Sequence, residues 1–357
     1  REKREECGNM AQERVKRMKK PKKKRRYNKW IVLGVVLLLI AAAAGYVISI
    51  FKDYDYQPLD TSDLGISQDE NAVSDDGSSD IVNIALFGVD QRNDQERVRS
   101  DSIMILSVDK KHDKIKIISL MRDTYVSIEG HDDTKLTHAY YYGGPQLAVK
   151  TINQNFGTNI TEFATVNFQQ MAAIIDAVGG VEIDITEAER VNANSSIYEQ
   201  AQSSGLPLDY IEKAGLQTLN GTQAVAYARI RYVGNADFDR TERQRKVMRQ
   251  LFEKALDMNP LQYPELARQL LPGVTTSLDF NDIMGLSGIL LRGDITMEEM
   301  RIPRNEHLIG SGSITDSGGG ACLNVDLEAA SETIRAFIYD DVNPDSSQET
   351  ESTGSGE

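Results

Sequence analysis

The chain contains one run of residues, Ile31–Phe51, in which no side chain is charged. Thirteen of its 21 residues are Leu, Ile, Val or Phe, and as a helix it would be about 32 Å long, enough to cross the hydrocarbon core of a bilayer. A basic cluster, Lys19–Lys29, directly precedes the run, and Trp30 stands at the junction. Because basic residues beside a span stay on the cytoplasmic side, we predict a single membrane span with a cytoplasmic N-terminus and an extracellular remainder.

Two alternative interpretations of this region use the same residues. Ile31–Ile40 resembles the apolar core of a cleaved signal peptide, with small residues at Ala42–Ala44. The apolar run continues to Phe51, however, and the basic segment is long, which favours an uncleaved anchor. A basic segment can also bind nucleic acid, but this one has no interleaved aromatic residue beyond Tyr27, so we expect no nucleic-acid partner.

Charge and cysteine content limit the remaining classes of protein. Residues 1–29 hold 14 basic and 4 acidic side chains, whereas residues 52–357 hold 26 basic and 50 acidic ones, so the formal net charge of −14 describes neither part. Only Cys7 and Cys322 occur, which excludes a disulfide framework and a cysteine-rich zinc site. With four histidines and no His/Cys cluster, any metal would be a hard ion bound by oxygen.

These patterns divide the chain into segments. Residues 52–80 contain one base and nine acids without apolar periodicity, which is typical of a self-repelling linker. The acidic, Ser-rich end of the chain has no apolar pattern either. We expect a basic cytoplasmic head at 1–30, a transmembrane helix at 31–51, an extracellular linker at 52–80, one folded domain at 81–341 and a disordered acidic tail at 342–357.

Strand and helix patterns alternate within the folded domain, which indicates an α/β layered fold with a central sheet. The predicted strands are Ile81–Val89, Ser102–Val108, Ile115–Leu120, Tyr125–Ile128 and Val181–Ile185. The predicted helices are Gln146–Phe156, Phe168–Val178, Arg240–Leu256, Leu261–Leu271, Asn281–Leu291 and Leu327–Tyr339. Residues 192–215 have no strong pattern, and we expect a mobile flap there.

Two carboxylates lie beside neighbouring predicted strands. Asp90 follows the first strand, at the kind of strand end where open α/β sheets bind ligands, and Asp101 begins the next one. Carboxylates at adjacent strand ends can share Mg²⁺, which takes oxygen ligands and keeps waters or phosphate oxygens. Capping of a turn is the alternative role for either residue alone.

Cationic residues near the next strands suit a phosphate group. Arg122 follows Ile115–Leu120, and Lys135 lies a few residues further on. Arginine offers phosphate a planar bidentate fork, and lysine a compact point charge. A salt bridge to a neighbouring aspartate is the alternative role for Arg122.

The segment 229–249 is the most informative, because it is basic within an acidic region. If extended, Arg229 and Arg231 project from one face. Asp239, three residues before Glu242, is a plausible cap of the helix that follows. Arg240 and Gln244 share a helix stripe with apolar residues that must face the core: Val247, Met248, Leu251 and Ala255. An inward arginine needs an anion, so we predict a phosphate site here, with a solvated basic face as the alternative.

Taken together, these motifs resemble the LytR-CpsA-Psr family of cell-envelope proteins. The resemblance covers about residues 81 to 252, in the family's order. The matching pieces are Phe87–Arg92, Arg99–Asp101, Leu120–Thr124, Lys135–Tyr140, Gly179–Asp184, Leu219–Gly221, Ala228–Arg231 and Phe238–Arg245. The short basic head and single span also fit. One departure is Thr137, where the family often carries Asn.

The resemblance implies an α-β-α fold with a central mixed sheet and an Mg²⁺-dependent (or Mn²⁺-dependent) phosphotransferase. The donor would be an undecaprenyl-pyrophosphate-linked polymer, such as wall teichoic acid or capsular polysaccharide. The acceptor would be peptidoglycan, and the product a phosphodiester. By the same resemblance Asp90, Asp101 and Arg122 would be catalytic, and the two carboxylates would also bind the metal. The pyrophosphate would be held by Arg99, Arg122, Lys135, Arg229, Arg231, Arg240 and Gln244.

Two other functions fit the same residues. With water as the acceptor, the metal and arginine set would make a polyprenyl-pyrophosphate hydrolase. Without catalysis, the chain would be a membrane-bound envelope regulator, in line with the family's older label of transcriptional attenuator. A lipid-linked donor further requires an apolar slot beside the charged site, and residues such as those of Phe168–Val178 are candidates to line it, with an ordinary core role as the alternative.

Overall fold

The computed structural model describes residues 54–66, 80–91, 97–235, 237–290, 292 and 295–345. The chain divides into two compact units, Arg1–Ser49 and Ile50–Glu357, and all described residues belong to the second. Within these ranges there is no helix long and apolar enough to cross a membrane. The predicted span Ile31–Phe51 and its basic head lie outside the described residues, so the anchor and its orientation stay predictions.

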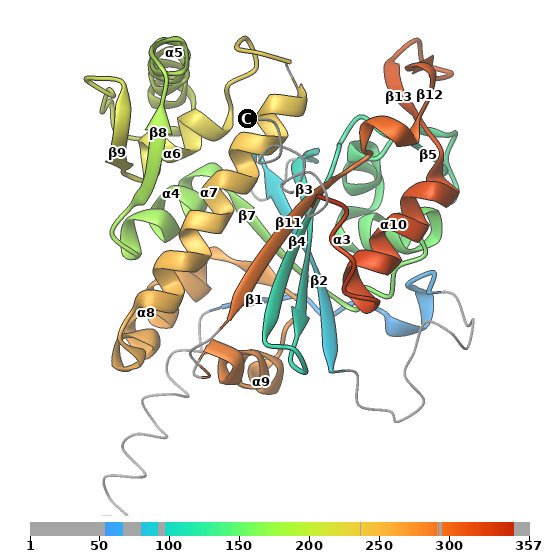
Figure 1. Cartoon of the computed structure of the whole chain (residues 1–357), viewed down its shortest axis with the longest axis horizontal. Coiled ribbons are helices and arrows are strands. Elements are labelled where there is room, and N and C mark those ends of the chain that lie inside the picture. The colour runs from blue at the N-terminus through green and yellow to red at the C-terminus, as the bar shows by residue number, and fades with distance from the viewer. Residues whose placement is uncertain are drawn as a thin grey trace, which may run out of the picture. The chain divides into compact units, whose positions relative to one another are not determined.

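A seven-stranded mixed sheet forms the centre of the domain (Figure 1), in the order β1-β10-β7-β2-β3-β4-β11. The strands are β1 (Asp55–Tyr56), β2 (Ile81–Val89), β3 (Ser100–Asp109), β4 (Lys114–Leu120), β7 (Glu162–Asn167), β10 (Thr275–Thr276) and β11 (Thr296–Ile302). The pairs β1–β10, β7–β2 and β4–β11 are parallel, and the pairs between them are antiparallel. The predicted α/β fold with a central mixed sheet is confirmed.

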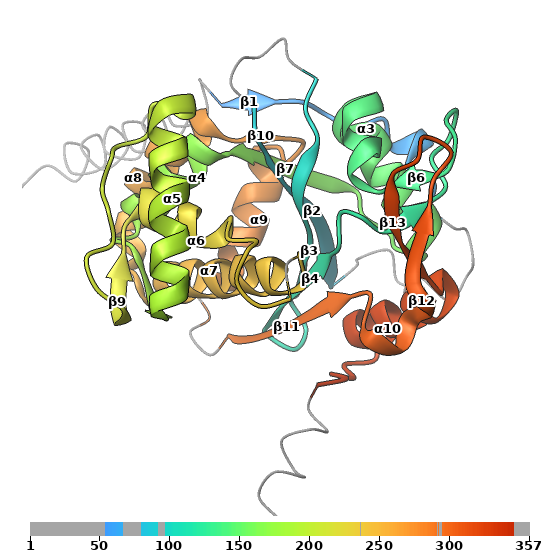
Figure 2. The same cartoon turned by 90° about the horizontal axis from the view of Figure 1, so that it is seen from above.

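Helices cover both faces of this sheet, as Figure 2 shows from above. One face packs on α3 (Thr137–Phe156) and α10 (Leu327–Tyr339), and the other on α7 (Asp237–Asp257) and α9 (Phe280–Leu290). Strands β3 and β4 are therefore buried almost throughout, and the middle of β3, Ile103–Leu106, is a continuous apolar run.

A second core lies under the first half of α7, away from the sheet centre. It is built from α4 (Phe168–Ala177), α5 (Glu187–Ser204), α6 (Gly221–Ala228) and the hairpin of β8 (Val181–Ile185) and β9 (Gly215–Leu219). Each of these three helices begins with a capping box, at Asn167, Thr186 and Asn220, so local sequence defines their starts.

Short elements complete the domain. They are β5 (Tyr125–Val126), β6 (Thr134–Lys135), α8 (Tyr263–Leu270), β12 (Leu308–Thr315), β13 (Ala321–Val325) and the 3-10 turns Thr61–Asp63, Pro260–Gln262, Leu271–Gly273 and Asn305–His307. Helix α3 is interrupted at Gly143–Gly144, where Gly144 has φ +63°, and ends at Gly157, as the pattern of Gln146–Phe156 predicts.

Three local expectations differ from the structure. Residues 54–66, expected to be linker, pack on the domain: β1 joins the sheet edge and Leu64 is 2% exposed within the core. Residues 192–215 do not form a flap, because most of their first half is helix α5. Helix α7 starts at Asp237, so Asp239 lies inside its first turn, where Oδ2 accepts a hydrogen bond from the backbone N–H of Asn235.

Candidate active site

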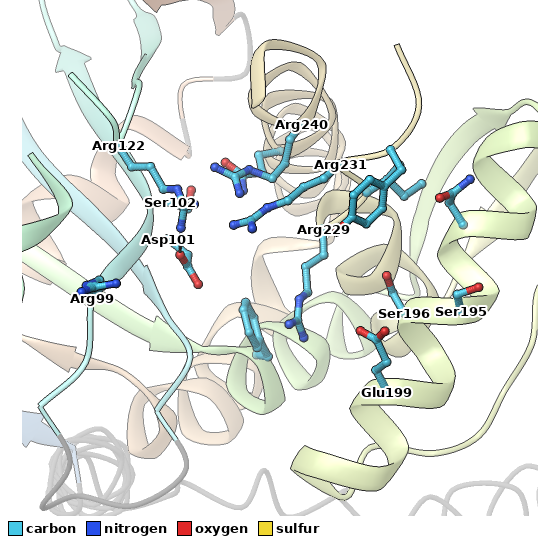
Figure 3. Close-up of a pocket in the computed structure, with 15 residues that line it drawn as sticks. Arg99, Asp101, Ser102, Arg122, Ser195, Ser196, Glu199, Arg229, Arg231 and Arg240 are labelled. Carbon is cyan, nitrogen blue, oxygen red and sulfur yellow. Dashed lines mark hydrogen bonds and ion pairs between the residues drawn. The ribbon is translucent and has the colours of Figure 1, made fainter. Parts of the chain in front are cut away.

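A cavity of about 520 Å³ opens between one edge of the central sheet, helix α5 and the N-terminal half of α7 (Figure 3). Its walls contain five arginines and two carboxylates. The lining residues are Arg99, Asp101, Ser102, Arg122, Phe168, Asn192, Ser195, Ser196, Glu199, Arg229, Ile230, Arg231, Tyr232, Arg240 and Gln244. In this acidic region of the chain, the cavity concentrates positive charge where a phosphate-bearing ligand would need it.

The sheet contributes a carboxylate and a guanidinium that face each other. Strands β3 and β4 are antiparallel, with Ile103 opposite Leu120, so the start of one and the end of the other meet at one edge. Arg122 follows β4 and donates through Nη1 to Oδ1 of Asp101 in β3. Both side chains stay partly exposed, at 19% and 31%, so the pair remains accessible from the cavity.

Arg229 and Arg231 both reach the cavity, but not from an extended strand as predicted. Arg229 is the C-terminal cap of α6, with φ −97° and ψ −7°, because the helical backbone continues past Ala228. Buried Ile230 anchors the turn between the two arginines. The Arg229 guanidinium lies 4.2 Å from the ring centre of Phe168 and 4.0 Å from Asp90.

Helix α7 delivers Arg240 and Gln244 to the cavity, as its inward stripe predicts. Arg240 is 4% exposed, and the same stripe buries Val247 and Leu251 in the second core. Nη2 of Arg240 lies 3.2 Å from Asp237, but its buried Nε has no hydrogen-bond partner within the described ranges. Burial, and to a smaller extent the charge of Arg122, lowers the pKa of Arg240 to about 10. An anion in the cavity would offset the cost of burying the Arg240 charge and would accept a hydrogen bond from its unpaired Nε.

Arg243, three residues after Arg240 on α7, holds the turn that carries Arg229 and Arg231 in place. Its Nε donates to Oε1 of Glu189 at 2.8 Å, Nη1 to the carbonyl of Ile230 at 3.3 Å, and Nη2 to the carbonyl of Val233 at 3.1 Å. Burial raises the pKa of Glu189, but its hydrogen bonds with Arg243 and Thr186 and the charge of Arg243 together outweigh this, so the pKa is lowered overall. One side chain thus connects α7, the Arg229–Arg231 turn and the start of α5.

Of the other predicted site residues, Asp90 and Lys135 lie beside this cavity, whereas Arg99 lines it. Asp90 is next to Arg229, and both Asp90 and Asp101 counter the burial that lowers the pKa of Arg229. Lys135 donates through Nζ to Oδ1 of Asp123 at 2.9 Å and does not line the cavity. Arg99 lines the cavity, with its guanidinium 5.9 Å from the ring centre of Tyr141. Arg92 falls outside the described residues.

Sequence reasoning missed the wall that helix α5 provides. Asn192, Ser195, Ser196 and Glu199 all face the cavity from this helix (Figure 3). The available signal is the capping box Thr186–Glu189, which marks the start of a helix that has little apolar periodicity. Ser102, Phe168 and Tyr232 are further lining residues that no motif singled out.

The predicted metal ligands form only part of a coordination sphere. Within the described ranges, no cluster of three or more His, Cys, Asp or Glu side chains could hold a metal ion. Asp90 and Asp101 supply the oxygen donors that Mg²⁺ prefers, and both lie near Arg229. Since Arg122 already engages Asp101, a bound ion would need phosphate oxygens and waters to complete its shell.

A smaller apolar pocket of about 80 Å³ adjoins the charged cavity. The two share Ser102, Phe168, Arg229 and Gln244. Beyond these, the lining is mostly aliphatic or sulfur-containing: Met104, Val166, Met171, Val225, Ala228, Val247 and Met248. Polar and apolar binding surfaces are therefore continuous, and Phe168 and Met171 come from the helix expected to line such a slot.

The fold and this cavity define an α/β domain with an arginine-lined pocket beside its central sheet. The sequence model of the LytR_cpsA_psr family matches residues 56–323. The chain belongs to this family, as its motifs suggested.

Relatives from three bacteria show the same relationship. The chain is 29% identical to the polyisoprenyl-teichoic acid–peptidoglycan teichoic acid transferase TagU of Enterococcus faecalis, across 71% of this chain and 80% of that protein. It is 28% identical to the regulatory protein MsrR of Staphylococcus aureus, across 80% and 82%. The TagT protein of Bacillus subtilis has a similar fold, with a TM-score of 0.60 and 21% identity over 80% of this chain and 99% of that one.

Proposed function

We propose that this protein transfers a polyprenyl-pyrophosphate-linked anionic glycopolymer to peptidoglycan and forms a phosphodiester. The cavity in which five arginines surround Asp101 carries this proposal, because it offers guanidinium forks to a buried diphosphate. The relative TagU is named as a transferase of this kind. We further propose undecaprenyl as the lipid, and wall teichoic acid or capsular polysaccharide as the polymer.

The residues of the site divide the work of phosphoryl transfer. In the reaction an acceptor hydroxyl oxygen forms a bond to the phosphorus next to the polymer, and the bridging bond to the lipid phosphate breaks. The hydroxyl proton passes to solvent or to the released lipid phosphate. Such a reaction needs alignment and charge neutralisation more than covalent participation by the protein. Arg122, Arg231 and Arg240 would hold the diphosphate oxygens, and Asp101 would fix the Arg122 fork through their ion pair.

The apolar pocket supports a lipid-linked donor. It shares four residues with the charged cavity, so a diphosphate held by the arginines would place the first isoprene units against Phe168 and Met171. At about 80 Å³ the pocket would have to widen for a long chain. Met171, Met104 and Met248 suit this, because methionine side chains repack at low cost. A relative of 20% identity, TagT, has been solved with bound octaprenyl pyrophosphate lipid.

We propose that Mg²⁺ or Mn²⁺ binds at Asp90 and Asp101 together with the diphosphate. The ion would supply charge neutralisation at the phosphoryl oxygens. Removing divalent ions with a chelator should abolish transfer, and adding Mg²⁺ should restore it. Full transfer in the chelated protein would show that the arginines suffice.

We also propose that residues 31–51 anchor the protein in the cell membrane by a single span, with the domain outside the cell. A donor that is embedded in the bilayer favours a tethered enzyme. Protease treatment of intact spheroplasts should remove the folded domain and leave the basic head protected. Protection of the folded domain instead would reverse the proposed orientation.

Reconstituted transfer tests the proposed reaction against its alternatives. The full chain would be mixed with a polyprenyl-pyrophosphate-linked polymer and uncrosslinked peptidoglycan strands, and both polymer attachment and free polymer phosphate would be measured. We expect attachment, and we expect Asp101→Ala to lose most of it. Release without attachment would indicate a hydrolase. Normal cellular function of Asp101→Ala would indicate a non-catalytic regulator, as the name of MsrR suggests for that relative.

A further inference from the structure

A second cavity, of about 330 Å³, lies on another side of helix α7. This size is within the range of ligand pockets. Phe238, Glu242 and Arg245 line it at helical spacing, whereas Arg240 and Gln244 on the same helix face the first cavity. Asn305 and Arg301 add to its wall from the end of β11 and the turn that follows.

Arg245 is a half-buried cation whose guanidinium the described part of the protein satisfies incompletely. Its Nε and Nη1 atoms are buried and make no hydrogen bond within the described ranges. Burial lowers the pKa of Arg245, and the largest opposing influence is Glu299. Glu299, however, is already paired with Arg249 at 3.0 Å. A negatively charged ligand in the cavity would compensate the Arg245 guanidinium.

Arg301 is held in a fixed orientation beside this site. Its guanidinium lies 4.4 Å from the ring centre of Phe238, Nε donates to the carbonyl of Pro303 at 3.0 Å, and Nη2 donates to Oδ1 of Asn305 at 3.1 Å. A side chain fixed in this way loses little conformational entropy when it binds a ligand.

The acidic residues of the cavity limit which anion fits. Asp239 and Glu242 line it together with the two arginines, so its charges balance. A polymer with a phosphate in each repeat would be repelled by these carboxylates. A glycan with hydroxyl and amide groups and an isolated carboxylate fits better, because the acids and Asn235 accept or donate hydrogen bonds and the arginines bind the carboxylate.

We propose that this second cavity is a subsite for the acceptor, in which Arg245 and Arg301 bind a carboxylate of the peptidoglycan strand. Phe238 and Arg240 lie in the same turn of a helix about 10 Å wide. A strand held in the second cavity would therefore have to span at least the width of the helix, about 10 Å, to bring a hydroxyl to the phosphate in the first. The donor polymer would leave along α5 past the uncharged side chains of Asn192 and Ser195. This inference rests on the proposed transfer to peptidoglycan.

The experiment compares acceptor and donor kinetics of the full chain. In Arg245→Gln and in Arg301→Gln, we expect the KM for uncrosslinked peptidoglycan strands to rise at least about tenfold, the loss typical of one charged hydrogen bond. The KM for the lipid-linked donor should stay within about twofold. Arg304→Gln is the matched control, because Arg304 pairs with Glu306 and Asp345 and does not line the cavity.

Chemical modification of the acceptor isolates the carboxylate. Amidated peptidoglycan strands should bind the wild-type protein about tenfold more weakly than unmodified ones, whereas both arginine variants should bind the two forms alike. If the variants change the KM of the donor instead, or retain wild-type preference for the carboxylate, the acceptor subsite is wrong. Asn305→Ala gives a milder test if the arginine variants prove unstable.

Direct binding separates this inference from the proposed function. Calorimetry with peptidoglycan strands alone requires no transfer and no donor. If the wild-type protein binds the strands, and the arginine variants bind them about tenfold more weakly, the subsite holds even where transfer fails. If transfer occurs and the variants bind the strands normally, the proposed function holds and the subsite is wrong.

Discussion

The two sides of the N-terminal half of helix α7 use buried arginines in opposite ways. Arg240 and Arg243 are three residues apart and 4% and 5% exposed. Arg243 donates to one carboxylate and two carbonyls, whereas Arg240 contacts Asp237 and leaves its Nε without a partner within the described ranges. Removal of a fully paired buried cation leaves its partner uncompensated and destabilises the fold, whereas an incompletely paired cation that faces a cavity is available to a ligand.

The largest expected effect is on stability, at Arg243. Arg243→Met should lower the free energy of unfolding by about 3–5 kcal/mol, because it leaves Glu189 buried and uncompensated. Urea denaturation of the full chain would measure this change. The double variant Glu189→Leu with Arg243→Met should recover much of the loss. An Arg243→Met protein as stable as wild type would remove the contrast between the two arginines.

The next effect is on ligand binding, at Arg240. Arg240→Met should weaken binding of polyprenyl pyrophosphate by about 10- to 100-fold, which corresponds to the ~1.5–3 kcal/mol of a charged hydrogen bond. Its free energy of unfolding should stay equal or rise, since a poorly paired buried charge is removed. Titration calorimetry and urea denaturation measure the two quantities. If Arg240→Met lost as much stability as Arg243→Met and bound the ligand with unchanged affinity, Arg240 would be a structural residue and not a ligand-binding one.

A smaller effect is expected from pH, through Glu189. The pKa of Glu189 is lower in the folded protein than in the unfolded chain, so its pairing stabilises the fold above the unfolded value of about 4.3. This contribution is lost as the pH falls through the lower, folded pKa. Between pH 6 and 3 the free energy of unfolding should therefore fall less steeply in Glu189→Gln than in wild type. Parallel curves would mean that Glu189 does not contribute to acid sensitivity.

The smallest effect is expected at Lys135. Its Nζ is bound to Asp123 and lies off the cavity, so Lys135→Gln should change pyrophosphate affinity by less than about threefold. The same calorimetric titration applies. A loss of tenfold or more would return Lys135 to the set of pyrophosphate-binding residues that the sequence predicts.

The inward face of α7 was predictable because the same helix stripe carries both apolar core residues and the two polar residues of the site. Val247 and Leu251 must be buried, and helical spacing then places Arg240 and Gln244 on the same side. Arg229 and Arg231 were placed at the cavity for the wrong reason: the pair reaches it from a helix cap and the following turn, since Ile230 is buried between them.

Helix α5 could not be found from periodicity, because one side packs in the second core while polar residues on another, partly exposed side line the charged cavity. Ala193 and Ile197 pack in the second core, while Asn192 and Ser196 face the charged cavity. Because polar residues stand beside the core positions, the helix shows no continuous apolar stripe in its sequence. Strand β11 could not be predicted from the sequence for a similar reason. Its Glu298 and Glu299 form ion pairs with Lys114 and Arg249, so the strand lacks the apolar pattern of a buried strand.

Strand β1 has a mechanical consequence. The described chain starts at Tyr54 and joins the sheet at once, parallel to β10, with the Gln57 N–H bonded to the carbonyl of Thr276 at 2.8 Å and Leu64 buried a few residues later. A pull on the preceding segment would load the β1–β10 hydrogen bonds first, before the force reached Leu64 or the central strands. If the proposed membrane anchor pulls on the domain, the short edge strand would therefore detach before the arginine-lined cavity is distorted.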